Sequence, residues 1–128
     1  MEFCGDAVSS LSLDSRFTIS NMVIECGAKY GIMEADRQVI DYIEQRAKRP
    51  YSPSPENYSM MDDGDFEEVM EIDCSIIEPQ VAFPSSPANS RPVSSMEHVE
   101  VDQVVLGSCT NGRYEDFEKA AKVLEGKK

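Results

Sequence analysis

All seven prolines of this 128-residue chain lie between residues 50 and 92, and this clustering limits the fold more than any other feature. Proline has no backbone N–H and breaks helices and central strands. Residues 50–65, also rich in Ser, Asn, Asp and Gly, predict a loop or linker, and residues 75–98 predict an extended, ordered coil. The chain thus divides into a helix-rich part at 1–65, a strand and proline-rich connection at 66–98, and a strand–turn–helix at 99–128.

Two helices are predicted before the prolines. The first runs from Asp14 or Ser15, either of which can cap it, to about Lys29, and Gly31 is its expected stop. Its apolar residues point to nearly all sides, so we expect most of its surface to be buried. The second follows Asp36 and runs to about Lys48. Its single apolar stripe consists of Val39, Ile40, Ile43 and Ala47.

Two strands and a last helix are predicted after the linker. Glu68 to Cys74 alternates apolar and acidic side chains, which indicates a strand. Val101 to Leu106 indicates a second strand, and Gly107 to Gly112 then turns the chain into a helix over about Tyr114 to Glu125. Its inward face is expected to carry Phe117, Ala120, Ala121 and Val123 or Leu124.

Length and charge exclude several classes of protein. A chain of 128 residues allows one ordinary domain or pieces of two. The 24 acidic against 12 basic residues give a net charge of −12, which disfavours nucleic acid or anionic lipid as a partner. Apolar runs are far shorter than the roughly 20 residues that span a bilayer, and the first residues do not resemble a secretory leader. We therefore expect a soluble, cytoplasmic protein.

The four cysteines form no C-x-x-C pair, so a self-contained zinc or thioredoxin-like site is not expected. A disulfide framework is also disfavoured in a protein with no secretory signal. Cys4, Cys26 and Cys74 are interpreted as small buried apolar residues.

Cys109 differs because it lies in the turn between a predicted strand and a helix, where exposed N–H groups bind anions and favour thiolate. Three interpretations remain open. Cys109 could be a buried turn residue beside a helix cap, a nucleophile activated by His98, the only histidine, or a thiolate ligand of an iron–sulfur cluster. The nucleophile elbow fits poorly, because Asn111 stands where that motif requires glycine.

Asn21 and Glu25 are the second candidate pair. They are four residues apart on the first predicted helix and would share one face. An amide and a carboxylate on an otherwise apolar helix are costly unless they are paired or face a polar cavity. The alternative is a solvated polar stripe.

Two segments of the chain resemble the aconitase superfamily. The sequence Val105-Leu106-Gly107-Ser108-Cys109-Thr110-Asn111-Gly112-Arg113 is similar to the family's first cluster-ligand segment, in the form found in 3-isopropylmalate dehydratase and homoaconitase large subunits. The sequence Arg16-Phe17-Thr18-Ile19-Ser20-Asn21-Met22, with Glu25 and Gly27-Ala28, resembles the family's R-x-T-I-x-N-M-x-x-E-x-G-A helix. The proline-punctuated stretch between them resembles the family's extended crossing.

The resemblance implies an iron–sulfur hydro-lyase that removes water from a hydroxy-acid and adds it back at the neighbouring carbon. Cys109 matches the first of three cysteines that hold a [4Fe–4S] cluster, and Asn21 and Glu25 match catalytic residues beside it. Thr110, Asn111 and Arg113 match the motif too, and we interpret them as serving turn geometry and local hydrogen bonds. The implied fold is α/β, a three-layer α/β/α arrangement of the large-subunit type, present here as an incomplete piece that spans two domains.

The family's remaining cluster ligands, a C-x-x-C pair, are not in this sequence, and neither is its N-terminal Asp/His segment. The chain is therefore expected to be an internal piece of a large subunit, inactive alone and without a stable cluster. Its implied partners are the small swivelling subunit and a small hydroxy di- or tricarboxylate substrate, and a homodimer of the piece is also expected, since its apolar faces lack cover. The alternative is a stand-alone, non-enzymatic interaction module that retains a degenerate cluster motif.

Overall fold

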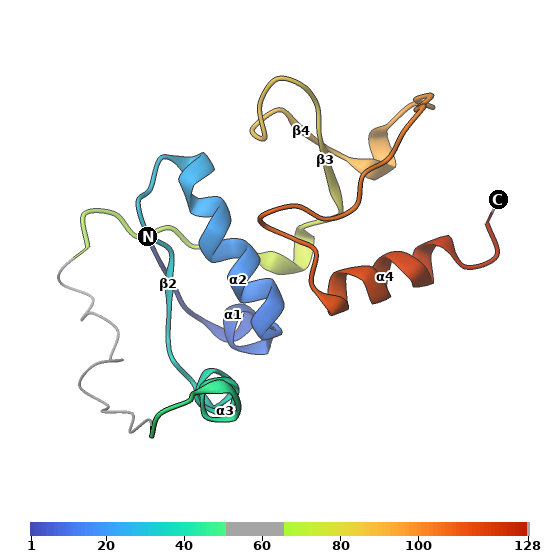
Figure 1. Ribbon diagram of the computed structural model, residues 1–128. Coiled ribbons are helices and arrows are strands. Elements are labelled where there is room, and N and C mark those ends of the chain that lie inside the picture. Colours follow the sequence, from blue (N-terminus) through green and yellow to red (C-terminus); the bar gives the residue numbers. More distant parts are fainter. Residues whose placement is uncertain (51–65, 128) are drawn as a thin grey trace. The chain divides into compact units, whose positions relative to one another are not determined.

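The computed structural model describes residues 1–50 and 66–127 (Figure 1). These residues belong to two compact units. One unit combines Met1–Phe66 with Leu106–Lys128, and the other is Glu67–Val105. We call them unit 1 and unit 2. The linker predicted at 50–65 lies, beyond its first residue, outside the described residues.

Unit 1 begins with a short parallel pairing that the sequence did not predict. Strand β1 (Glu2–Phe3) pairs with β2 (Ile32–Met33), with Glu2 opposite Ile32. The N-terminal amine of Met1 donates to the Tyr30 carbonyl at 2.8 Å, which fixes the start of the chain. The connection between the two strands carries helix α1 (Asp6–Ser10), helix α2 and a 3₁₀ turn, because parallel strands need a long crossover.

Helix α2 (Leu13–Met22) starts two residues earlier than a cap at Asp14 predicts, three earlier than a cap at Ser15, and ends sooner than predicted. Its N-cap is Ser12, whose hydroxyl accepts a bond from the Ser15 N–H at 3.2 Å. The chain continues as the 3₁₀ turn Val23–Cys26, which stops at Gly27 with a positive φ of 82°. The predicted stop, Gly31, has another role: a Cβ there would lie 2.9 Å from the Ser20 Cα, so glycine permits close contact with α2.

The expectation that this helix is buried on most sides is wrong. Among the described residues, only Val23 and Arg16 are buried, at 3% and 4% exposure, while Ile24 is 65% exposed. The apolar residues do point to several sides, as the sequence indicates, but residues 13–20 are half-buried or buried, whereas most side chains from Asn21 to Lys29 are exposed. Arg16 lies in the covered part and donates to Asp36 at 2.6 Å and to the Ser9 carbonyl at 3.0 Å.

Helix α3 (Arg37–Arg46) confirms the prediction at its start and ends close to the predicted residue. Asp36 is its N-cap, with Oδ1 accepting from the Val39 N–H at 3.3 Å. Val39, Ile40 and Ile43 of the predicted stripe are half-buried, although Ala47 is exposed. The Tyr42 ring meets Phe17 of α2 edge-on, with 5.9 Å between ring centroids.

Unit 2 differs from its prediction. Its strands, β3 (Gln80–Ala82) and β4 (Ser90–Pro92), form an antiparallel hairpin inside the stretch predicted as coil. The segments Glu68–Cys74 and Val101–Leu106, predicted as strands, have no ladder partner among the described residues and are not strands. Alternation creates a tendency to form a strand, but a strand also needs a partner. Short 3₁₀ turns at Cys74–Ile76 and Val93–Ser95 flank the hairpin.

The last helix, α4 (Tyr114–Leu124), confirms its prediction to within one residue. Its predicted inward residues are less covered than expected: Ala120 is half-buried, whereas Phe117 is 46% exposed and Leu124 63% exposed. Helices and small sheets together make the described chain a mixed α/β structure, as predicted at that level. None of the described helices has the length and apolarity needed to cross a bilayer.

Candidate functional site

The loop that carries Cys109 is narrow and is closed by two glycines. Gly107 and Gly112 have positive φ values of 97° and 137°, which favour glycine. A Cβ built on Gly107 would lie 3.4 Å from the Gly112 Cα, so the two ends of the loop approach closely. The Ser108 N–H donates to the Asn111 carbonyl within the loop. Cys109 and Thr110 therefore occupy the turn between two converging ends.

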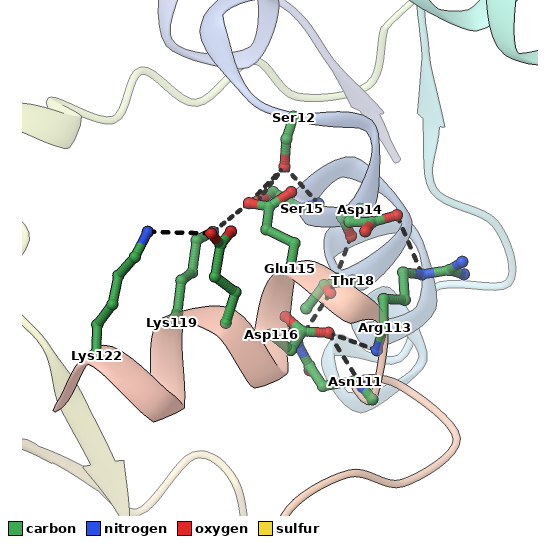
Figure 2. Close-up of polar contacts among 12 residues, drawn as sticks. Ser12, Asp14, Ser15, Thr18, Asn111, Arg113, Glu115, Asp116, Lys119 and Lys122 are labelled. Atoms are coloured by element: carbon green, nitrogen blue, oxygen red, sulfur yellow. Dashed lines mark hydrogen bonds and ion pairs between the residues drawn. The ribbon is translucent and has the colours of Figure 1, made fainter. Parts of the chain in front are cut away.

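Asp116, on the first turn of α4, anchors this loop. Its Oδ2 accepts from the backbone N–H groups of Gly112 and Arg113, both at 3.0 Å, and its Oδ1 accepts from Asn111 Nδ2 at 3.2 Å (Figure 2). These bonds, that from Gly112 first, hold the pKa of Asp116 below its ordinary value. Asp116 thus connects the helix to three consecutive residues of the loop.

Two side-chain hydrogen bonds join the loop to α2. Thr110 Oγ1 donates to Asn21 Oδ1 at 2.7 Å, and Asn111 Nδ2 donates to Thr18 Oγ1 at 3.3 Å. Thr18 and Asn21 are three residues apart on α2, so they lie on the same side of the helix. The structure therefore brings the Cys109 loop to Asn21, as the two sequence motifs suggested.

Contacts between the first turns of α2 and α4 support this junction (Figure 2). The guanidinium of Arg113 stacks 4.5 Å from the Phe17 ring centre, and its Nε lies 3.6 Å from Asp14 Oδ1. Ser12 Oγ donates to Glu115 Oε1 at 3.0 Å. A bond from Lys119, followed by the Ser12 bond, lowers the pKa of Glu115.

The sequence interpretation is therefore incomplete, because it assigned only turn geometry and local hydrogen bonds to Thr110, Asn111 and Arg113. Thr110 and Asn111 bond to residues 89 and 93 positions away. Sequence reasoning also missed Asp116, although an acidic residue three positions after a helix N-cap is a recognisable capping signal. No comparable signal marks Thr18, because its role depends on contact between distant segments.

Cys109 is exposed, and its Sγ lies 3.9 Å from Thr110 Oγ1. Glu25 is exposed on the 3₁₀ turn that follows α2, and no described contact joins it to Asn21 or Cys109. Its four-residue spacing from Asn21 therefore does not by itself produce the shared α-helical face that the sequence suggested. His98 lies in unit 2 and Cys109 in unit 1, so the nucleophile hypothesis stays a prediction.

Comparison with known proteins identifies the family to which the chain belongs. The model of the aconitase family (aconitate hydratase) matches residues 1–98 and 89–128. The chain belongs to the aconitase family. It is 52% identical over 128 residues to the 3-isopropylmalate dehydratase large subunit of Heliobacterium modesticaldum, a match that covers 100% of the chain and 30% of that protein.

Other members of the aconitase family are similar to the chain at the same level. The large subunit of the same name from Halothermothrix orenii is 50% identical over 127 residues, covering 99% of the chain and 29% of that protein. The 3-isopropylmalate dehydratase large subunit 1 of Pyrococcus furiosus is 49% identical over 130 residues, covering 100% and 30%. The chain thus spans less than a third of the length of these relatives, and the predicted resemblance is confirmed.

The described thiols can be compared with what a family-type cluster needs. All four cysteines are exposed, so the expectation that Cys4, Cys26 and Cys74 are buried is wrong. Within residues 1–50 and 66–127, no three His, Cys, Asp or Glu side chains converge on a point that could hold a metal ion. A [4Fe–4S] cluster with three protein ligands requires three thiolates. The described residues therefore do not form a complete cluster site, and Cys109 supplies one accessible thiol.

Proposed function

We propose that this chain is an internal segment of the large subunit of a 3-isopropylmalate dehydratase, an iron–sulfur hydro-lyase of leucine biosynthesis. The observation that carries the proposal is the docking of the Cys109 loop on α2, where Thr110 meets Asn21. Identity of about 50% across the whole chain to proteins of that name supports the proposal. It also favours 3-isopropylmalate over homoaconitate as the substrate. We also propose that the segment lies in a three-layer α/β/α architecture and spans parts of two domains.

In the complete protein, Cys109 would be one thiolate ligand of a [4Fe–4S] cluster, with two further cysteines supplied from outside this chain. When bound, the cluster supplies a Lewis acid for the hydroxyl and carboxylate of the substrate. The Asn21 amide would donate from Nδ2 to an oxygen of the bound acid. The Glu25 carboxylate, which is exposed in unit 1, would accept a proton or a hydrogen bond at its oxygens.

The proposed partners follow from the same assignment. A separate small subunit would complete the substrate site, and the substrate would be a hydroxy-dicarboxylate. The net charge of −12 supports a protein that binds neither nucleic acid nor anionic membrane. A place in the cytoplasm is part of the same proposal. Exposed apolar residues such as Phe117 and Leu124 support a homodimer when the segment is produced alone.

The test uses the complete protein that contains this chain, produced with its small subunit and purified without oxygen. We expect about four irons and four sulfides per large subunit, and conversion of 3-isopropylmalate to an unsaturated acid, followed by ultraviolet absorbance of the new double bond. The homologous tricarboxylate substrate of homoaconitase is the specificity control. A protein that binds no iron and dehydrates neither acid would contradict the proposal.

Two other functions make different predictions. A stand-alone interaction module has no support in the comparisons, since the relatives named above are enzyme subunits. A cysteine hydrolase would lose an esterase activity when a thiol reagent modifies Cys109 at low pH. If the protein is a cysteine hydrolase, substitution of His98 would also abolish the esterase activity. If it is a dehydratase, the same substitution would leave dehydration intact.

A further inference from the structure

The side chain of Asn111 joins the Cys109 loop to two helices (Figure 2). Its Nδ2 donates to Thr18 Oγ1 of α2 at 3.3 Å and to Asp116 Oδ1 of α4 at 3.2 Å. An amide nitrogen carries two hydrogens, so these two bonds use both of them. The backbone of the same residue closes the loop, because its carbonyl accepts from the Ser108 N–H. Cys109 therefore lies in a turn whose last residue is held by both helices.

The partners of the Asn111 amide fix its orientation. Bonds from the Gly112 N–H and the other loop donors lower the pKa of Asp116, so its carboxylate is ionised at neutral pH and can only accept. An amide that was turned over would place Oδ1 against this carboxylate and be repelled. Thr18 agrees with this orientation, because its hydroxyl donates to the Asp14 carbonyl at 3.2 Å and keeps its lone pairs for Nδ2. Nδ2 thus faces an acceptor on each helix.

The direction in which the Cys109 thiol points depends on the conformation of this loop. The thiol is exposed, and its one described polar contact is Thr110 Oγ1 at 3.9 Å. The loop is bounded by Gly107 and Gly112, and glycine permits many backbone conformations when nothing else restrains it. Side-chain bonds from the loop to the helices must therefore select one conformation. Thr110 supplies one such bond to α2, and Asn111 supplies one to each helix.

We propose that Asn111 is a positioning residue that, by bridging Thr18 and Asp116, fixes the Cys109 loop in the conformation in which its thiolate binds the cluster. This inference rests on the proposed function and deepens it, because it names the contact that prepares the ligand. A ligand that is already held in place needs less reorganisation when it binds. Asn111 acts through Cys109, so its loss should weaken the retention of the cluster.

The first variant is Asn111→Asp in the complete protein. Aspartate has nearly the shape of asparagine, but it places a carboxylate oxygen against Asp116. In cluster-free protein, we expect amide hydrogen exchange over residues 107–113 to become roughly tenfold faster, the effect of about one lost hydrogen bond. Exchange over residues 80–92 of unit 2 should not change and serves as the internal reference. In the loaded protein, release of iron to a chelator should be at least about tenfold faster.

A second substitution should reverse this effect. Asp116→Asn, added to Asn111→Asp, supplies an amide donor to the new carboxylate, and its own oxygen can still accept from the loop N–H groups. The double variant should therefore regain most of its loop protection and iron retention. The matched control is Glu115→Gln, the same kind of change one position earlier on α4. Glu115 bonds to Ser12 and Lys119 and has no described bond to the loop, so this change should rescue neither property.

A spectroscopic measurement separates movement of the ligand from general loosening of the chain. The electron paramagnetic resonance signal of the reduced cluster should shift in Asn111→Asp and return in the double variant. If Asn111→Asp does not fold, Thr18→Val removes the acceptor on α2 and should accelerate iron release by a smaller factor. Unchanged loop exchange and iron release in these variants, or equal rescue by Glu115→Gln, would overturn the inference. A wild-type protein that binds no iron would instead contradict the proposed function.

Discussion

The contacts inside unit 1 are of a different kind from the contacts inside unit 2. In unit 1, side chains join segments that are far apart in sequence, as in Thr110–Asn21 and Asn111–Thr18. In unit 2, the hairpin depends on neighbours in sequence: the Phe83 N–H donates to the Asn89 carbonyl at 2.9 Å, and β3 pairs with β4 through the backbone. No side chain between residues 67 and 105 is buried.

This difference predicts different responses to substitution. A hairpin closes a short loop at small entropic cost and uses backbone groups that every residue except proline supplies. The junction of α2, the Cys109 loop and α4 requires particular side chains at particular positions. Single substitutions should therefore be costly in unit 1 and tolerated in unit 2. The predictions below compare matched residues in the two units, beginning with the largest effect.

The largest difference is expected between Cys109→Ser and Cys74→Ser in the complete protein. Both thiols are exposed, but only Cys109 lies in the loop that docks on α2. Serine is a poor substitute for a thiolate ligand, so Cys109→Ser should lose most of its bound iron and at least about a hundredfold in dehydration rate. Cys74→Ser should keep both. Iron and sulfide analysis of the two purified proteins checks the first part without an activity assay.

Equal iron contents in the two cysteine variants would contradict the assignment of Cys109 as a ligand. A loss of iron in both variants would show that the difference between the units does not extend to cluster binding. The order of addition is a further check: a thiol reagent should modify Cys109 before iron is added and be excluded afterwards.

The next largest effect is expected at two aspartates that cap helices. Asp36 caps α3 and accepts from Arg16, whose side chain is 5% exposed, so Asp36→Ala leaves a buried cation without its partner. We expect a loss of roughly 3 kcal/mol in the opening free energy of α3. Asp73 caps a 3₁₀ turn in unit 2 through Ser75 alone, and Asp73→Ala should leave its surroundings unchanged. Amide hydrogen exchange of each element measures both.

The helices show how much of this structure the sequence could predict. Helices α3 and α4 were predicted closely because their signals are local: an apolar period of 3.6 residues, and for α3 a capping Asp36. The strands at 68–74 and 101–106 were predicted wrongly because a strand depends on a partner that alternation does not identify. The burial of α2 was overestimated for a similar reason, since the period tells where apolar residues point but not what covers them.

The candidate site divides in the same way. The turn with Cys109 could be located from its residues, and the resemblance to a family suggested that Asn21 lies near it. Asp116 could have been found from its position after the helix cap. The bond from Thr110 to Asn21 could not, because it depends on how two segments 89 residues apart approach each other.

The stabilisation that Asp36 contributes to α3 should depend on pH. The hydrogen bond from Arg16 lowers the pKa of Asp36 below the ordinary value, near 3.9 in unfolded chains. The unfolded state therefore binds this proton more readily, so the stabilisation is fully present above about pH 4 and is lost as the pH falls through the folded pKa. Protection of the Val39 amide, corrected for intrinsic exchange, should fall in this range. Asp36→Asn should remove that part of the pH dependence, and identical curves for the two proteins would contradict the assignment.

The smallest expected difference concerns a contact that occurs in both units, an arginine stacked on a phenylalanine. Arg113 lies 4.5 Å from the Phe17 ring centre and is also paired with Asp14, whereas Arg91 lies 5.1 Å from Phe83. Exposed contacts of this type are worth about 0.5–1 kcal/mol, and an exposed ion pair adds a few tenths. Arg113→Ala should therefore destabilise the start of α4 by about 1 kcal/mol.

Arg91→Ala should cost half of that or less, confined to the hairpin, and Arg113→Lys should retain the charge and part of the stacking. Hydrogen exchange of the α4 amides and of the β3–β4 amides measures these effects in the same sample. The stacking is similar in both units. If Arg113→Ala costs more stability than Arg91→Ala, the difference therefore measures what the additional contact of Arg113 with Asp14 of α2 contributes. Equal losses at the two arginines would mean that the distant contacts of unit 1 are no more important than the local contacts of unit 2.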